Sequence, residues 1–187
     1  MNLKYLLLGS ISAAVIALDQ ATKIYVHTQF QLHESIDVID GFFNLTYVRN
    51  TGAAFGFLAN SPEVFRELFF LSMPPIALVI IFWILRSVQE KDRLNITALS
   101  LVFGGAIGNY IDRVRFRYVI DFLDFHIDKK WSWPAFNIAD SAIVVGVMIL
   151  LYLEFTRAKI QADGSTTSSS GASNPTSQQA IQPPNSK

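Results

Sequence analysis

The chain has 187 residues, of which 51% are hydrophobic and 16% charged, with a formal net charge of zero. This composition is too apolar for an ordinary soluble domain of that length, so it favours a membrane protein, and the even charge argues against nucleic-acid binding. Cysteine is absent, which excludes disulfides, thiol nucleophiles and thiolate metal sites.

Four apolar stretches predict a mainly α membrane protein with four transmembrane helices. The first stretch follows Lys4 and could instead be the core of a signal peptide, but no convincing A-x-A cleavage site follows it and more spans come later. Crossing a bilayer takes about 20 residues, so the first helix should continue through Asp19. The predicted spans cover residues of about 3–25, 68–85, 96–111 and 138–155.

Several residues within these spans need an explanation. Asp19 and Lys23 are four apart on one helix face, which indicates an ion pair whose lysine snorkels to the membrane surface. Pro74, followed by a second proline, predicts that the second helix either begins there or bends there. Gly104 and Gly108 form a small-residue face that lets another helix approach closely.

Between the first two spans, short runs rich in β-branched and aromatic residues replace the helical pattern. Asp40 and Gly41 lie between two such runs and predict a turn. A small β hairpin or sheet outside the membrane is therefore expected over residues of about 36–56. The small residues from Asn50 to Gly56 permit close backbone approach or form a turn.

The composition changes again after the fourth span. Residues 161–187 are rich in Ser, Gln and Pro and cannot bury enough apolar area to offset the chain entropy. A disordered tail is predicted there. No internal repeat divides the remainder, so residues 1–160 are predicted to form one membrane domain.

Carboxylates gather between and beside the third and fourth spans. A charged side chain at membrane depth costs at least about 2.5 kcal/mol, so it marks a functional site by default. The acids are Asp112, Asp121, Asp124, Asp128 and Asp140. All but Asp128 can lie at one membrane face.

Two carboxylates held close together cannot both ionise easily, so such a pair shares one proton. One member can then activate a water while the other protonates a carbonyl, which is aspartic protease chemistry and needs no metal or cofactor. From spacing alone, structural ion pairs with Arg113, Arg115 and Arg117 explain the acids equally well.

Two other functions also stay open at this point. Intramembrane acids mark ion pathways, so a small proton-coupled carrier is one alternative. A non-catalytic scaffold subunit that docks through Gly104 and Gly108 is the other. The three histidines, His27, His33 and His126, lack the spacing of a helical metal site, so no metal is expected. Similar numbers of Lys and Arg fall on both sides of the membrane, which leaves the orientation open.

Five blocks of the sequence form a recognisable set: Asp19–Lys23, Asn50–Phe55, Gly108–Arg113, Val119–Phe122 and Phe136–Ser141. In this order, they resemble the lipoprotein signal peptidases, which are the type II signal peptidases of bacteria. Each block alone is a weak signal, but the five together are specific. The tail after about Gln161 lies outside the resemblance.

The resemblance implies an aspartic endopeptidase of the bacterial inner membrane, with both termini cytoplasmic and the active site at the periplasmic face. It implies Asp121 and Asp140 as the catalytic pair. The residues that it places around this pair or the substrate are Asp19, Asn50, Asn109, Arg113 and Asn137. Asp112, in the block Gly108–Arg113, is expected to pair with another residue for a structural role. Asp124 and Asp128 match no motif and are expected to be solvated loop acids.

The implied substrate is a prolipoprotein whose cysteine already carries diacylglycerol. Cleavage just before that cysteine would release the signal peptide. The expected partners are therefore this substrate and membrane lipids, with no nucleic acid and no cofactor, and the chain is expected to act as a monomer.

Overall fold

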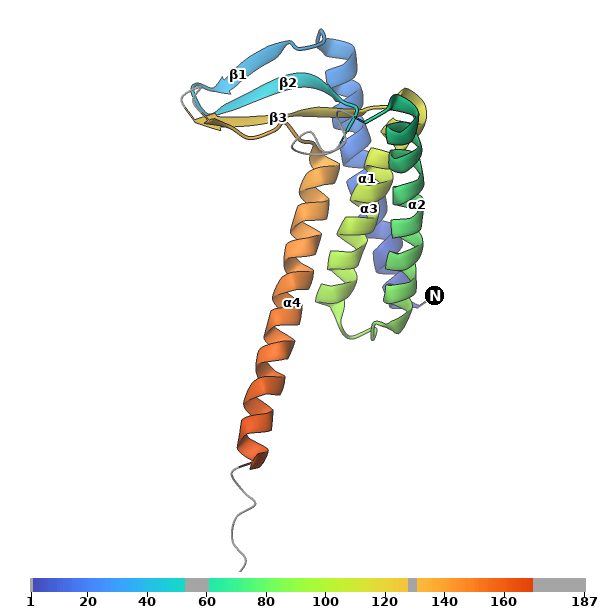
Figure 1. Ribbon diagram of the computed structural model, residues 1–187, viewed down its shortest axis with the longest axis vertical. Coiled ribbons are helices and arrows are strands. Elements are labelled where there is room, and N and C mark those ends of the chain that lie inside the picture. The colour runs from blue at the N-terminus through green and yellow to red at the C-terminus, as the bar shows by residue number, and fades with distance from the viewer. Residues whose placement is uncertain (1, 53–60, 128–130, 170–187) are drawn as a thin grey trace, which may run out of the picture. The chain divides into compact units, whose positions relative to one another are not determined.

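The computed structural model describes residues 2–52, 61–127 and 131–169 (Figure 1). Two compact units are distinguished, Met1–Leu151 and Tyr152–Lys187, and the described part of the second is helical. The elements are α1 (Leu3–Gln29), β1 (Ser35–Ile39), β2 (Phe43–Asn50), α2 (Glu63–Ser87), α3 (Arg93–Phe116), β3 (Val119–Ile127), β4 (Trp131–Ser132) and α4 (Ile138–Ser169).

Among the described residues, four helices are long and apolar enough to span a membrane, which confirms the predicted fold class. The spanning segments are Leu3–Gln29, Glu63–Ser87, Arg93–Phe116 and Ile138–Gln161. They extend beyond the predicted bounds because a helix, once formed, gains a hydrogen bond with each added residue. Because α2 begins at Glu63 and contains Pro74, the alternative of a helix start near Pro74 is wrong.

The end of α4 also differs from the prediction. The helix continues to Ser169, whereas the sequence predicts that a disordered tail begins at residue 161. Residues 170–187 lie outside the described residues, so the disorder of that part stays a prediction.

The segments between the helices form an antiparallel sheet in the order β1-β2-β3-β4. The predicted hairpin is confirmed, since β1 pairs with β2 and Gly41 takes a left-handed φ of 69° in the turn. No strand was predicted between the third and fourth spans, but residues 119–127 form β3, which pairs with β2. The acids at positions 121 and 124 interrupt the apolar pattern of this strand and hide its signal.

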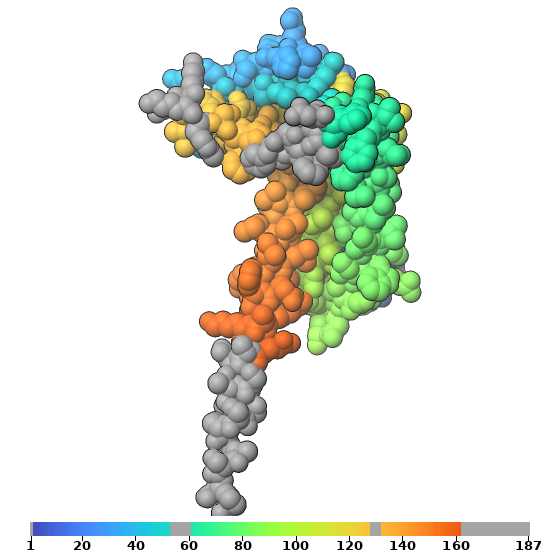
Figure 2. Space-filling model, viewed as in Figure 1, coloured from blue at the N-terminus to red at the C-terminus, as the bar shows by residue number. Residues whose placement is uncertain are grey.

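The sheet lies across one end of the membrane helices. In Figure 1, β1, β2 and β3 run side by side from the end of α1 across the start of α4, and Figure 2 shows the blue-to-cyan atoms of β1 and β2 next to the yellow-orange atoms of β3. A core cluster of Val26, Tyr47, Ile120 and Phe122 joins α1 to β2 and β3. The sheet is thereby fixed to the helical part of the unit.

Glycines let α3 pack closely on α1 and on the start of α4. A Cβ added at Gly104 would lie 2.9 Å from the Cα of Ser12 on α1. A Cβ added at Gly105 would run into the carbonyl oxygen of Ala139 on α4. The predicted small-residue face is therefore used within the chain, which removes the docking surface that the scaffold alternative required.

Candidate active site

Strand β3 carries Asp121 to the end of the helices. The neighbouring residues Ile120 and Phe122 are 1% and 4% exposed and belong to the core against α1. Because side chains alternate along a strand, Asp121 points to the opposite face of the sheet. Asp121 is itself only 2% exposed, so its carboxyl group is held away from bulk water.

Asp140 lies in the first turn of α4, where Asn137 forms a reciprocal capping box with it. The Asn137 Oδ1 accepts a hydrogen bond from the Asp140 backbone N–H at 2.9 Å, and the Asp140 Oδ2 accepts one from the Asn137 N–H at 3.3 Å. The N-terminal end of a helix favours an anionic side chain. The N-I-A-D sequence thus starts the helix and orients the carboxylate at the same time.

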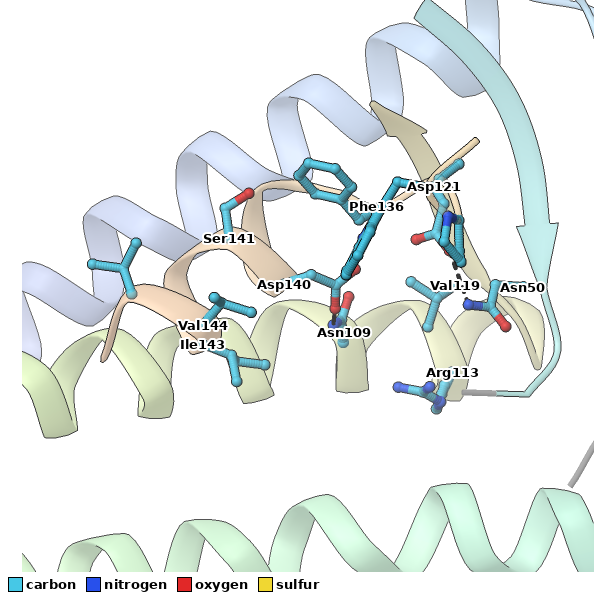
Figure 3. Close-up of a pocket in the computed structure, with 14 residues that line it drawn as sticks. Asn50, Asn109, Arg113, Val119, Asp121, Phe136, Asp140, Ser141, Ile143 and Val144 are labelled. Atoms are coloured by element: carbon cyan, nitrogen blue, oxygen red, sulfur yellow. Dashed lines mark hydrogen bonds between the residues drawn. The ribbon is translucent and has the colours of Figure 1, made fainter. Parts of the chain in front are cut away.

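Asparagine amides hold both carboxylates (Figure 3). Asp121 accepts hydrogen bonds from Asn50 Nδ2 at 2.9 Å and from Asn137 Nδ2 at 2.7 Å. Asp140 accepts one from Asn109 Nδ2 at 2.7 Å. Asn137 therefore contacts both aspartates, one through its amide and the other through the cap.

The surroundings raise the pKa of Asp121 from 3.8 to about 7. Burial is the largest cause, and the nearby negative charge of Asp140 is the second. The amides of Asn50 and Asn137 act in the opposite direction, because they stabilise the ionised form. At neutral pH the pair can therefore hold one proton between its two carboxyl groups.

A cavity of about 590 Å³ opens beside the two carboxylates. Its polar lining consists of Asn50, Asn109, Arg113, Asp121 and Asp140. Its apolar lining comes mainly from residues 133–136, which precede α4, and from residues 143–145 on α4. A chemically polar end and an apolar wall thus share one cavity.

Arg113 borders this cavity and links three elements. Its Nη2 donates a hydrogen bond to the Gly52 carbonyl at 3.2 Å, and its guanidinium lies 4.9 Å from the ring centroid of Phe70 on α2. Between described residues, no ion pair joins Asp121 or Asp140 to an arginine. Asp121 and Asp140 therefore form no close ion pair with an arginine among the described residues, although the charge of Arg113 acts on both carboxylates at longer range.

The other acids of this region have separate surroundings. Asp112 is 1% exposed and lies 3.1 Å from the Lys23 ammonium, so the expected structural pairing is present. Asp124 lies within β3, and its Oδ2 is 3.9 Å from Nδ1 of His126. The prediction of a solvated loop acid is wrong for Asp124, because the missed strand includes it. Asp128 lies outside the described residues.

Asp19 and Lys23 form the predicted ion pair, at 2.9 Å. The predicted snorkelling is wrong, since the two side chains are 0% and 1% exposed. The Lys23 ammonium points inward because it also finds Asp112 and the Asn109 Oδ1 there, the latter at 2.8 Å. Asp19 consequently lies behind the two carboxylates and not in the cavity.

The structure thus gathers six of the seven predicted site residues directly around the cavity or the two carboxylates, with Asp19 in the layer behind. Lys23 was predicted only as a snorkelling partner of Asp19 and not as a part of the site, and the apolar wall of the cavity was not predicted. The aromatic and proline residues of 131–136, between two acidic motifs, were an available signal for that wall. In the described ranges, no group of three or more His, Asp or Glu side chains could hold a metal ion.

Comparisons with known proteins identify the family of this chain. Residues 11–156 match the family model of signal peptidase (SPase) II. A lipoprotein signal peptidase of Syntrophus aciditrophicus (strain SB) is 54% identical over 149 residues, which cover 79% of this chain and 92% of that protein. A lipoprotein signal peptidase of Desulforapulum autotrophicum is 49% identical, over 76% of this chain and 87% of that protein.

Solved structures show the same fold. A structure described as a bacterial membrane enzyme, solved by the in meso method at 2.3 Å, has a TM-score of 0.73 and 34% identity over 81% of this chain and 88% of that one. A second, at 1.9 Å, has a TM-score of 0.70 and 32% identity, over 78% of this chain and 90% of that one.

The fold, with two carboxylates beside one cavity at the end of four apolar helices, and these matches define an aspartic peptidase of the bacterial membrane. More particularly, the chain belongs to the signal peptidase II family. Membership of a peptidase family decides against the carrier and the non-catalytic scaffold.

Proposed function

We propose that this enzyme removes the signal peptide from diacylglyceryl-modified prolipoproteins, cutting just before the lipidated cysteine, with Asp121 and Asp140 as its catalytic pair. The names of its relatives support the substrate class. The observation that carries the mechanism is the pair itself: two carboxyl groups beside one cavity, one of them with a pKa raised to about 7.

The surroundings of the two acids suggest different roles. Asp121 is buried in the sheet and retains a proton near neutral pH, so it donates a hydrogen bond, then the proton, to the oxygen of the scissile carbonyl. Asp140 borders the same cavity from the first turn of α4, so it acts as the general base that removes a proton from the attacking water. The asparagine amides keep both groups in place between turnovers.

The apolar wall of the cavity supports a lipid-anchored substrate. Residues 143–145 lie within the spanning segment of α4, so the cavity continues from the carboxylates along the membrane part of the helix. A substrate held in the bilayer by its own helix and acyl chains could enter there without leaving the membrane. Arg113, fixed between Gly52 and Phe70, would border its polar backbone.

We place the site at the periplasmic face of the inner membrane, with both termini in the cytoplasm. Lys23 and Arg113 add to the number of basic residues on that side, but both belong to the site. Lys23 is buried among carboxylates, and Arg113 lines the cavity. Setting them aside makes the opposite side the more basic one, in agreement with the positive-inside rule. Both carboxylates and their amide partners come from one chain, which supports activity as a monomer.

The test is cleavage of a purified diacylglyceryl-modified prolipoprotein in liposomes. The parent enzyme should release the signal peptide and leave the lipidated cysteine at the new N-terminus, as mass spectrometry would show. Asp121→Asn and Asp140→Asn should reduce cleavage to background. Asp124→Asn is the matched control, because Asp124 lies on the same strand but does not line the cavity. Undiminished cleavage by a folded Asp121 or Asp140 variant would remove that residue from the pair.

A further inference from the structure

Lys23 on α1 is a charged residue in an interior position, and the mechanism proposed above does not use it. It is 1% exposed, and its ammonium has three partners: Asp19 Oδ2 at 2.9 Å, Asp112 Oδ2 at 3.1 Å and Asn109 Oδ1 at 2.8 Å. An ammonium has three protons to donate, so these contacts satisfy it completely. The lysine therefore links α1 to two positions on α3.

Each carboxylate paired with Lys23 also holds a backbone N–H next to the site. Asp19 Oδ1 accepts from the Ala139 N–H at 2.9 Å, and Ala139 directly precedes Asp140. Asp112 Oδ2 accepts from the Ile120 N–H at 3.1 Å, and Ile120 directly precedes Asp121. The two elements that carry the proposed catalytic aspartates, α4 and β3, are thus attached to the same ammonium through one carboxylate each.

The contact between Lys23 and Asn109 determines how the Asn109 amide faces Asp140. An ammonium can only donate, so the oxygen of the Asn109 amide must turn towards Lys23. Asn137 Nδ2 also donates to that oxygen, at 3.2 Å. The Asn109 Nδ2 is left to point the other way, where it donates to Asp140 Oδ1 at 2.7 Å. With Lys23 removed, the Asn109 oxygen keeps only the longer contact from Asn137, so the orientation of this amide is held less firmly.

We infer that Lys23 is a positioning residue for the reaction, since through Asp19, Asp112 and Asn109 it fixes the separation and orientation of the two catalytic aspartates. This inference rests on the proposed function, in which Asp121 and Asp140 do the chemistry. Lys23 does not line the cavity and touches neither catalytic carboxylate in the contacts described here. It should therefore affect the rate of the chemical step and not the binding of substrate.

The test compares Lys23→Met with Lys4→Met in the purified full-length enzyme, using the prolipoprotein cleavage assay. Lys4 is a matched control because it is also a buried lysine on α1, at 8% exposure, but its ammonium donates to the carbonyls of Arg86 and Val88, away from the site. Displacing a reacting group by about 1 Å can cost roughly 100-fold in rate. Lys23→Met should lower kcat by about that factor with KM within roughly twofold, whereas Lys4→Met should keep the parent kcat.

A double-mutant cycle tests the route through Asn109. If Lys23 acts partly by orienting this amide, the loss in kcat of the Lys23→Met, Asn109→Ala double variant should be clearly smaller than the product of the two single losses. Multiplicative losses would overturn the Asn109 part of the inference. A merely structural lysine would lower the melting temperature without this coupling in kcat.

Asp112→Ala and Asp121→Asn complete the test. If Lys23→Met does not fold, Asp112→Ala decides, because it frees the Ile120 N–H while leaving Lys23 and Asp19 as a one-to-one ion pair. It should also lower kcat with KM nearly unchanged, and a parent-like kcat in a folded variant would overturn the inference. Asp121→Asn serves as the reference in the same assay: if it stays active, the proposed catalytic pair has failed, which is distinct from failure of the Lys23 inference.

Discussion

At the scale of single residues, the ionisation of Asp121 couples stability to chemistry. A buried acid whose pKa lies near 7 binds its proton more tightly in the folded protein than in the unfolded chain, where the value is near 3.8. The folded state therefore carries the extra proton between about pH 4 and pH 7, and stability falls as pH rises through that window. The proton needed to protonate the substrate carbonyl is thus retained at a cost in stability at higher pH.

This linkage predicts a pH-dependent difference between the parent protein and Asp121→Asn, which cannot titrate at this position. On going from pH 5 to pH 8, the melting temperature of the parent in detergent should fall relative to that of the variant. Asp124→Asn should not reproduce the effect. A constant difference between parent and Asp121→Asn across this range would contradict the raised pKa.

Asn137 has two tasks, and its replacement should show both. Asn137→Ala removes the helix cap of α4, which should cost about 1–2 kcal/mol of stability. It also removes the amide donor to Asp121, so the cleavage rate should fall by roughly 100-fold. Asp92→Ala is the control, because Asp92 caps α3 through the Asn95 N–H. It should cost similar stability in thermal unfolding while cleavage per folded molecule stays at the parent value.

At the scale of elements, α3 is the helix on which the site depends. It carries Asn109, Asp112 and Arg113, and its glycines allow α1 and α4 to come close enough for those side chains to meet Lys23 and Asp140. A methyl group in these contacts would meet backbone atoms, which have little freedom to move away.

The close packing predicts a contrast between glycines. Gly104→Ala and Gly105→Ala should each destabilise the protein by about 1–3 kcal/mol through overpacking and should lower cleavage, because the helices must separate. Gly9→Ala is the matched control on α1, where an added Cβ has nothing within 4 Å. It should be neutral or stabilise the helix by up to about 1 kcal/mol. The measurements are the melting temperature in detergent and the rate of cleavage. Equal values for the three variants would contradict the close packing of α3.

At the scale of the whole molecule, the absence of cysteine makes the proposed orientation directly testable. Asp37 lies on β1, in the sheet at one end of the helices, whereas Glu90 lies between α2 and α3 at their other end, and both residues are exposed (Figure 1). In intact cells stripped of the outer membrane, Asp37→Cys should react with a membrane-impermeant maleimide, whereas Glu90→Cys should react only after lysis. Both variants should keep cleavage activity, since neither residue lines the cavity. The reverse labelling pattern would place the site on the cytoplasmic side.

Several features of this protein could be predicted from local sequence. Apolar runs long enough for a bilayer define the four helices, because the membrane demands that length whatever the neighbours are. The turn at Gly41 defines the β1–β2 hairpin, since few other residues accept its backbone conformation. Asp121 and Asp140 are two of several acids beside apolar spans, where a charge is costly without a function, and the resemblance to type II signal peptidases singled out this pair.

Only the tertiary structure decided the role of residues whose partners are distant in sequence. Strand β3 exists because β2 pairs with it, and that pairing turned Asp124 from an expected loop acid into a strand residue. Lys23 turns inward because Asp112 and Asn109, from another helix, replace water around its charge. Periodicity and composition report how a residue prefers to be solvated, whereas the satisfaction of a buried charge depends on which other groups the fold brings within hydrogen-bonding distance.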